Sequence, residues 1–146
     1  MTPNHARLLV ADDSRMLRQV IRELLQDLGF VTIDEAPDGA AALSLFLEKP
    51  YDLVLTDWNM PSLSGIELLR AIRSGDVRNQ TAVVLFTGDM SARRMVEALE
   101  SGANGFVAKP FAVPALCDKI LRIIASVPPK SEFVPTRIPS SLRARL

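Results

Sequence analysis

The sequence predicts an α/β protein whose core is a doubly wound, five-stranded parallel sheet. Five short apolar runs alternate along the chain with five segments that have the period of an amphipathic helix. The central run, Leu53-Val54-Leu55, is apolar without alternation, which is typical of a strand buried on both faces of a parallel sheet. Strict alternation of strands and helices favours crossover connections, and right-handed crossovers place helices on both faces.

The expected elements follow from these runs and periods. We expect strands at residues 7–11, 30–33, 53–57, 82–86 and 105–108. We expect helices at residues 17–28, 40–48, 65–72, 91–101 and 113–125. Each helix carries an apolar stripe that should pack on the sheet. In the helix at 91–101, the residues expected to point inward are Met95, Val96 and Leu99.

The composition indicates one domain followed by a short tail. The chain has 146 residues with 17 basic and 17 acidic side chains, so its charge favours neither nucleic acid nor a membrane as a partner. We expect a domain over residues 6–125 and a tail over residues 126–146 that is extended or disordered, because four prolines interrupt it. The 21 residues of the tail are too few for a DNA-binding domain. Its role, as a partner contact or a linker remnant, stays open.

The sequence favours a cytoplasmic location. The single cysteine, Cys117, rules out an internal disulfide, and its place in an apolar helical pattern predicts a buried structural thiol. No apolar run approaches the roughly 20 residues that span a bilayer. The first residues lack the basic and then apolar pattern of a signal peptide.

Polar side chains follow four of the predicted strands at the points where these strands end. Asp12 and Asp13 follow the first strand, Asp57 ends the third, Thr87 follows the fourth and Lys109 follows the fifth. Each residue alone is more typical of a helix cap or a solvated surface group. Parallel strands end at the same edge of a sheet, where α/β proteins bind ligands. Three acids, a hydroxyl and a lysine together therefore indicate a functional site.

The chemistry open to these groups is narrow. Carboxylates about 5 Å apart repel each other by roughly 3 kcal/mol per pair at an effective dielectric near 20. Mg²⁺ or Mn²⁺ would relieve that repulsion, because hard cations prefer carboxylate oxygens. Asp57 can act as a nucleophile that forms an aspartyl-phosphate. The cation, the Lys109 ammonium and the Thr87 hydroxyl could then each contact one phosphoryl oxygen, and Gly88 leaves room for the donor.

Taken together, these motifs resemble those of a known protein family. Asp12-Asp13, Asp57 within Asp-Trp-Asn-Met-Pro, Thr87-Gly88 and Lys109-Pro110-Phe111 are similar to the signature of the receiver domain of two-component response regulators, of the stand-alone, chemotaxis-regulator type. The resemblance covers about residues 6 to 125. It implies a flavodoxin-like fold with strand order 2-1-3-4-5, and this order comes from the resemblance alone.

The resemblance implies a role for each site residue. Asp57 would be the phosphoacceptor, and Asp12, Asp13, Asp57 and the backbone carbonyl of Asn59 would hold the metal ion. Lys109 would pair with the phosphoryl group, with a cis peptide bond before Pro110. The donor would be a sensor histidine kinase or a histidine phosphotransfer protein.

The resemblance also implies a switch and an output face. Thr87 would move toward the phosphate, and the ring of Phe106 would turn inward behind it. Phe106 lacks the phenolic hydroxyl often found at this position, and a plain core ring remains the alternative. A downstream protein target would bind the face formed by residues 91–125. Asn59 and Asp89 would set the lifetime of the phosphoryl group.

The function we expect is a single-domain response regulator, a signalling protein with no enzymatic turnover. The main alternative is a receiver-like interaction domain that is not phosphorylated. A phosphatase or dehalogenase with an aspartate nucleophile would want a second acid two residues after Asp57, where the chain has Asn59. A flavin mononucleotide carrier would want a Ser/Thr-rich phosphate loop where the chain has Asp12 and Asp13.

Overall fold

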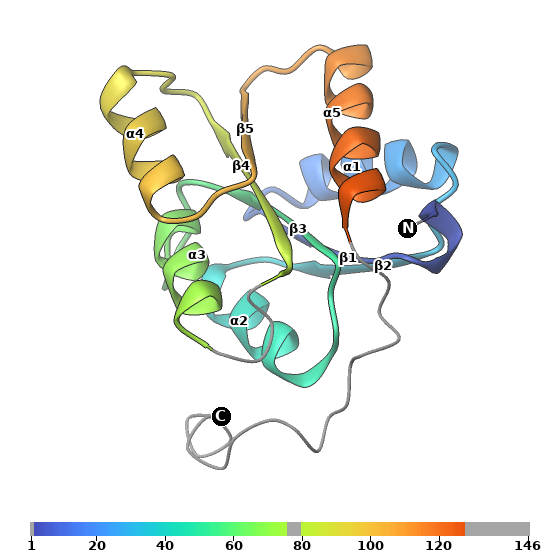
Figure 1. Ribbon diagram of the computed structural model, residues 1–146, viewed down its shortest axis with the longest axis horizontal. Helices are drawn as coiled ribbons and strands as arrows, with labels where there is room; N and C mark the ends of the chain where they lie inside the picture. Colours follow the sequence, from blue (N-terminus) through green and yellow to red (C-terminus); the bar gives the residue numbers. More distant parts are fainter. Residues whose placement is uncertain (1, 76–79, 128–146) are drawn as a thin grey trace.

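The structure is a computed structural model that describes residues 2–75 and 80–127, and its centre is a five-stranded parallel sheet (Figure 1). The strands are β1 (Arg7–Ala11), β2 (Thr32–Ala36), β3 (Leu53–Asp57), β4 (Ala82–Thr87) and β5 (Gly105–Ala108). They lie in the order β2-β1-β3-β4-β5. The predicted parallel sheet and the order 2-1-3-4-5 are both confirmed.

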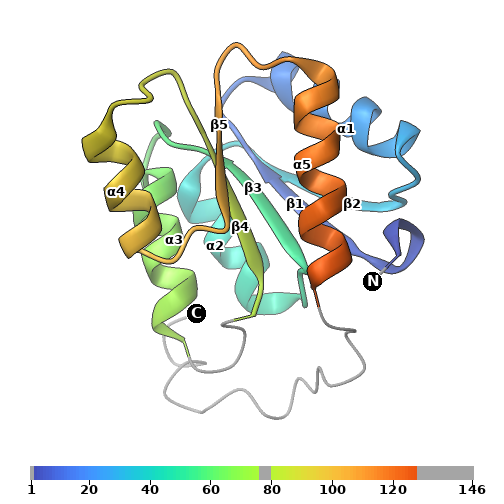
Figure 2. The same ribbon diagram turned by 45° about the horizontal axis from the view of Figure 1, so that its top comes forward.

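Helices cover both faces of the sheet. They are the short 3₁₀ helix η1 (Pro3–His5) and the α-helices α1 (Arg15–Asp27), α2 (Gly39–Glu48), α3 (Gly65–Ser74), α4 (Ala92–Glu100) and α5 (Val113–Ser126). Helices α1 and α5 lie on one face, and α2, α3 and α4 lie on the other (Figures 1 and 2). Each face has its own apolar cluster, one built on Ile21, Leu25 and Ile120 and the other on Phe46 and Leu69. The doubly wound architecture is therefore confirmed.

The central strand β3 and its neighbour β4 are buried along their whole length. Their continuous apolar sequences fit this position, because helices cover both sides of each strand. Asp57 is the last residue of β3 and pairs in register with Phe86 of β4. The next residue, Trp58, extends the pairing when its backbone N–H donates to the Phe86 carbonyl at 2.9 Å. Asp57 is thus held by the rigid centre of the sheet.

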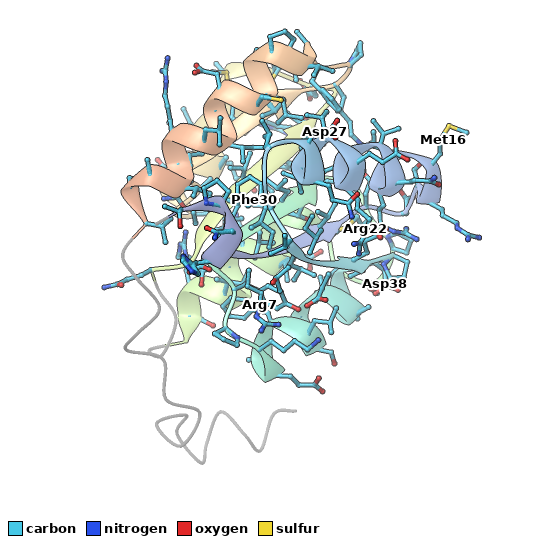
Figure 3. The ribbon with its side chains drawn as sticks, turned by 90° about the vertical axis from the view of Figure 1, so that its right-hand side faces the viewer. Arg7, Met16, Arg22, Asp27, Phe30 and Asp38 are labelled. Atoms are coloured by element: carbon cyan, nitrogen blue, oxygen red, sulfur yellow. The ribbon has the colours of Figure 1, made fainter. Side chains whose placement is uncertain are left out.

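The second strand lies further along the chain than the sequence predicts. We expected it at residues 30–33, but β2 runs from Thr32 to Ala36. Phe30 is an interior side chain (Figure 3) and is only 1% exposed, whereas Val31 is 69% exposed. The strand includes two acids, Asp34 and Glu35, because β2 is at the edge of the sheet, where half-exposed side chains can form ion pairs. An apolar run alone therefore misplaced this edge strand.

The orientation of α4 also differs from the prediction. We expected Met95, Val96 and Leu99 to point inward, but Val96 and Leu99 are 51% and 58% exposed and Met95 is half-buried. Ala98 is the fully buried residue of this helix. A small side chain at the contact allows the helix to approach the sheet closely, and this leaves the larger apolar residues at the surface.

The burial of Cys117 and the end of α5 also differ from the prediction. Cys117 is only partly buried, because Leu116 and Ile120 occupy the core side of α5. Helix α5 continues to Ser126, and Val127 is buried after it. The predicted extended or disordered tail lies, from residue 128 onward, outside the described residues.

Within residues 2–75 and 80–127, none of the helices has both the length and the apolar character needed to cross a bilayer.

Gly65, the first residue of α3, is expected to be required for folding around Asp57. A Cβ atom at this position would collide with the backbone carbonyl oxygen of Asp57 and would lie 3.0 Å from Leu85 Cδ2. Gly65→Ala should therefore lower the free energy of unfolding by about 1–3 kcal/mol, measured by urea denaturation. Gly88→Ala is the matched control, because nothing lies within 4 Å of a Cβ there. Equal stability of the two variants would contradict the prediction.

Candidate functional site

Three carboxylates meet at the carboxyl edge of the sheet, as the sequence predicts. Asp12 and Asp13 follow β1 and Asp57 ends β3, and these two strands are hydrogen-bonded neighbours. One oxygen of each carboxylate lies within 4.8 Å of the others. Asp12 and Asp57 are buried, and Asp13 is exposed to solvent. The cluster therefore has a buried base and one side that is open to solvent.

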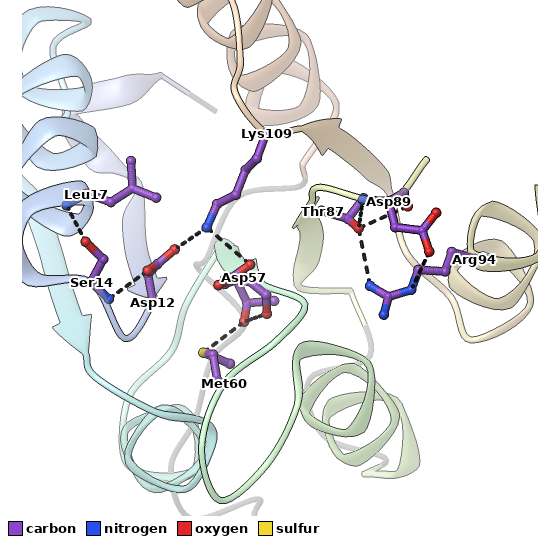
Figure 4. Close-up of polar contacts among 10 residues, drawn as sticks. Asp12, Ser14, Leu17, Asp57, Met60, Thr87, Asp89, Arg94 and Lys109 are labelled. Atoms are coloured by element: carbon purple, nitrogen blue, oxygen red, sulfur yellow. Dashed lines mark hydrogen bonds and ion pairs between the residues drawn. The ribbon is translucent and has the colours of Figure 1, made fainter. Parts of the chain in front are cut away.

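The ammonium group of Lys109 lies between the two buried acids (Figure 4). Its Nζ is 3.0 Å from Asp12 Oδ2 and 3.2 Å from Asp57 Oδ1. Lys109 follows β5, and its backbone N–H donates to the Thr87 carbonyl at the end of β4. The Lys109-Pro110 peptide bond is cis, as the resemblance implied. Four of the five predicted side chains, at the ends of three strands, are thus brought together.

Asp12 is held rigidly by its surroundings. Its Oδ1 accepts a hydrogen bond from the backbone N–H of Ser14 at 2.8 Å, just before α1 begins. Its backbone carbonyl accepts from Arg18 Nη1 at 2.7 Å, and Arg18 also pairs with Glu35 of β2. The first turns of α1 and the edge strand therefore orient the carboxylate that faces Lys109.

The electrostatics of the site follow from burial and from the charges that face each other. Burial is the largest cause of the raised pKa of Asp57; Lys109 opposes the rise and Asp12 adds to it. For Lys109, burial is the largest single cause and lowers the pKa. The hydrogen bonds and charges of Asp12 and Asp57 outweigh burial, so that its pKa lies above the ordinary value. Lys109 therefore remains charged and balances part of the negative charge of the cluster.

The donor set of this cluster fits a hard divalent cation. Three carboxylates supply only oxygen ligands, which suits Mg²⁺ or Mn²⁺. Such an ion would share Asp12 and Asp57 with the Lys109 ammonium. Asn59, whose backbone carbonyl was the fourth predicted ligand, is an exposed residue in the loop after β3. Within the described residues, no hydrogen bond connects it to the carboxylates.

Thr87, the fifth predicted residue, belongs to a neighbouring network. Its hydroxyl donates to the Asp89 carbonyl and accepts from the Asp89 backbone N–H, both at 3.0 Å. It also accepts from Arg94 Nη1 at 3.3 Å. In the described part of the chain, no hydrogen bond joins Thr87 to Asp57. The two networks lie side by side in Figure 4 and remain separate.

Arg94 was expected on the output face, where it would suit an acidic partner, and was not predicted to lie at the site. Its guanidinium lies 4.6 Å from the centre of the Trp58 ring, and its Nε lies 3.5 Å from Asp89 Oδ2. It comes from the first turns of α4, after the N-cap Ser91. The sequence signal was weak, because an arginine near a helix start usually has no specific partner.

Phe106, the predicted switch aromatic, is half-buried in β5 and packs against the apolar cluster on the α2, α3 and α4 face. Lys119 of α5 donates to the Phe106 backbone carbonyl at 2.9 Å, and its ammonium lies 5.8 Å from the centre of the ring. This geometry is compatible with a mobile ring and with a simple core ring.

Comparison with known proteins identifies the family. Residues 8–121 match the response regulator receiver domain. The chain is 39% identical over 121 residues to the chemotaxis protein CheY of Pseudomonas aeruginosa. The aligned region covers 83% of this chain and 98% of that relative. The chain is also 37% identical over 117 residues to the chemotaxis protein CheY-3 of Vibrio cholerae, with coverage of 80% and 90%.

Solved structures agree. Chemotaxis response regulator CheY4 of Vibrio cholerae has a TM-score of 0.76 at 31% identity and covers 81% of this chain and 98% of its own. The receiver domain of a sensor histidine kinase from Pseudomonas aeruginosa, solved with a magnesium ion coordinated in its active-site cleft, has a TM-score of 0.75 at 26% identity, with coverage of 83% and 98%.

The fold and the acidic site thus define a receiver domain, and the chain belongs to this family of two-component signalling domains. Within the family it is closely related to the CheY-type response regulators. The family is one of signalling domains rather than metabolic enzymes.

Metal binding should depend on Asp12. Asp12→Asn keeps the oxygen that accepts from Ser14 but removes a ligand charge, so Mn²⁺ or Mg²⁺ affinity should fall about 10-fold or more. Isothermal titration calorimetry measures this affinity directly. Asp27→Asn, which changes an exposed acid at the end of α1, is the control and should bind as the unmodified protein does. Equal affinity of the Asp12→Asn variant would place the metal elsewhere.

Proposed function

We propose that the protein is a response regulator that accepts a phosphoryl group on Asp57 from a histidine kinase or a histidine phosphotransfer protein. The observation that carries this proposal is the position of Asp57, at the end of a fully buried strand and bound to an ammonium that it shares with Asp12. The acceptor is thus held in place while solvent reaches the cluster on the side of Asp13.

The chemistry requires a positioned nucleophile and stabilised charge. A carboxylate oxygen of Asp57 attacks phosphorus, a P–O bond forms, and the P–N bond to the donor histidine breaks as the imidazole leaves with the electron pair. Because the Lys109 ammonium already contacts Asp57, it can form an ion pair with the phosphoryl group once that group is attached to Asp57. A bound Mg²⁺, held by Asp12, Asp13, Asp57 and the Asn59 carbonyl, would supply further charge neutralisation.

The switch would operate through Thr87. To bind a phosphoryl oxygen, its hydroxyl has to give up the hydrogen bond that it donates to the Asp89 carbonyl. The end of β4 and the start of α4 would then rearrange, with Phe106 following. Val96 and Leu99 of α4 are exposed on the predicted output face, which supports a protein target there.

Phosphorylation is tested by intact mass after incubation with Mg²⁺ and acetyl phosphate. The unmodified protein should gain one phosphoryl group, and Asp57→Asn should gain none because its amide is not a nucleophile. Asp118→Asn, which changes an exposed acid of α5, should react normally. If no adduct forms with acetyl phosphate or with a histidine kinase, the unphosphorylated interaction domain becomes the better explanation.

The lifetime of the phosphoryl group should be short. Asn59 and Asp89 are both exposed beside the site, so polar side chains and water can reach the acyl phosphate. We expect self-dephosphorylation within seconds to minutes. The loss of radiolabel from the phosphorylated protein over time measures this rate. A half-life of many hours would contradict this expectation.

A further inference from the structure

The hydroxyl of Thr87 has no unused hydrogen-bonding capacity. A hydroxyl has one proton to donate and two lone pairs that accept. The Thr87 proton is directed to the Asp89 carbonyl, and the lone pairs accept from the Asp89 N–H and from Arg94. Thr87 is also buried, at 3% exposure, so water cannot readily replace a lost partner. Any movement of this hydroxyl toward Asp57 therefore breaks contacts that are already satisfied.

Among the described residues, Arg94 is the one hydrogen-bond partner of the Thr87 hydroxyl that comes from outside the loop between β4 and α4. Its guanidinium contacts Thr87 and Asp89 through nitrogen atoms (Figure 4). It also lies over the ring of Trp58, the residue directly after Asp57. One side chain of α4 thus connects the end of β3, the end of β4 and the loop between β4 and α4. Its side chain is only 24% exposed.

The three contacts of Arg94 differ in strength. Asp89 is 57% exposed and lies 3.5 Å away, so this ion pair contributes little. The hydrogen bond to Thr87 is long, at 3.3 Å, but its donor is charged and its acceptor is buried, so it contributes more than the exposed ion pair does. The buried ring of Trp58 orients the guanidinium and adds a cation–π attraction. The restraint therefore acts mainly on Thr87.

We propose that Arg94 is a positioning residue that restrains the Thr87 hydroxyl in the unphosphorylated protein and has to release it when Asp57 is phosphorylated. This inference rests on the proposed function. The inference assigns to Arg94 of α4 a part in the free-energy difference between the unphosphorylated and the phosphorylated conformation. Arg93, at the adjacent position, is exposed and makes no hydrogen bond or ion pair within the described residues, so it is the natural control.

The first test needs no phosphoryl group. In ¹³C,¹⁵N-labelled protein, Arg94→Ala should shift the Thr87 and Asp89 backbone resonances and the Trp58 ring resonances. Asp12 should be unaffected, and Arg93→Ala should leave the Thr87 and Trp58 resonances in place. The Asp89 resonances are not used in this control, because the Arg93 charge acts on Asp89. Arg94→Lys keeps a charged donor and should restore part of the shift; it also serves if Arg94→Ala does not fold. Unshifted Thr87 resonances in both Arg94 variants would overturn the restraint, whatever chemistry Asp57 performs.

The second test measures the free-energy coupling to the switch. Beryllium fluoride with Mg²⁺ imitates a phosphoryl group on a carboxylate, and its affinity can be followed through Trp58 fluorescence. Arg94→Ala should bind it roughly threefold to tenfold more tightly, because a partly exposed charged hydrogen bond no longer has to be broken. Arg94→Lys should fall in between, and Arg93→Ala should match the unmodified protein.

The sign of the second result decides between two roles of Arg94. Weaker binding by Arg94→Ala would show that the guanidinium contacts the phosphoryl group, and unchanged binding would show no coupling; either result overturns the proposal. If the unmodified protein binds no beryllium fluoride at all, the proposed function fails, and the resonance experiment still decides the restraint by itself.

Discussion

The arrangement of the site depends on one ammonium group placed between two buried carboxylates. Burial and the charge of Asp12 both oppose ionisation of Asp57 at the base of the cluster and raise its pKa. Lys109 supplies a compensating cation from the end of the edge strand β5, with contacts of 3.0 Å to Asp12 and 3.2 Å to Asp57. The contact with Asp57 lowers the pKa of the predicted acceptor and so opposes the effect of burial, and it places a positive charge where a phosphoryl group would form.

This arrangement is possible because the order of the strands places three chain segments at one edge. β1 and β3 are neighbours, so their terminal acids meet directly, and the loop after β5 returns Lys109 across the end of β4. Burial of β3 and β4 on both faces leaves Asp57 little freedom to move. Gly65 allows the chain after β3 to fold back against the Asp57 carbonyl, where no side chain would fit.

A second constraint acts on the neighbouring hydroxyl. Thr87 lies at the end of the strand beside β3, yet its hydrogen bonds connect it to the β4–α4 loop and to Arg94 rather than to the carboxylates. The side chains of the reaction centre and of the switch therefore form separate hydrogen-bond networks among the described residues, although the Lys109 backbone N–H donates to the Thr87 carbonyl. For phosphorylation to affect the switch, the Thr87 hydroxyl has to exchange its present hydrogen bonds for new ones. Such an exchange separates two discrete conformations.

The sequence by itself determined the architecture and the acidic centre. Continuous apolar strands alternating with helices define a parallel sheet, and parallel strands end at a common edge, so local patterns place Asp12, Asp13, Asp57 and Lys109 along that edge. The strand order that brings these residues into contact came from the resemblance to the family. The position of the edge strand β2, the exposure of Val96 and Leu99, and the partial burial of Cys117 did not follow. The contacts of Arg94 with Thr87 and Trp58 were also missed. These features depend on which residues pack against each side chain. Periodicity in the sequence identifies the apolar stripe of a helix, but it does not specify which part of that stripe the rest of the protein buries. Only the packed tertiary structure brings a residue of α4 onto the ring beside Asp57, because that contact joins segments whose separation in sequence carries no signal.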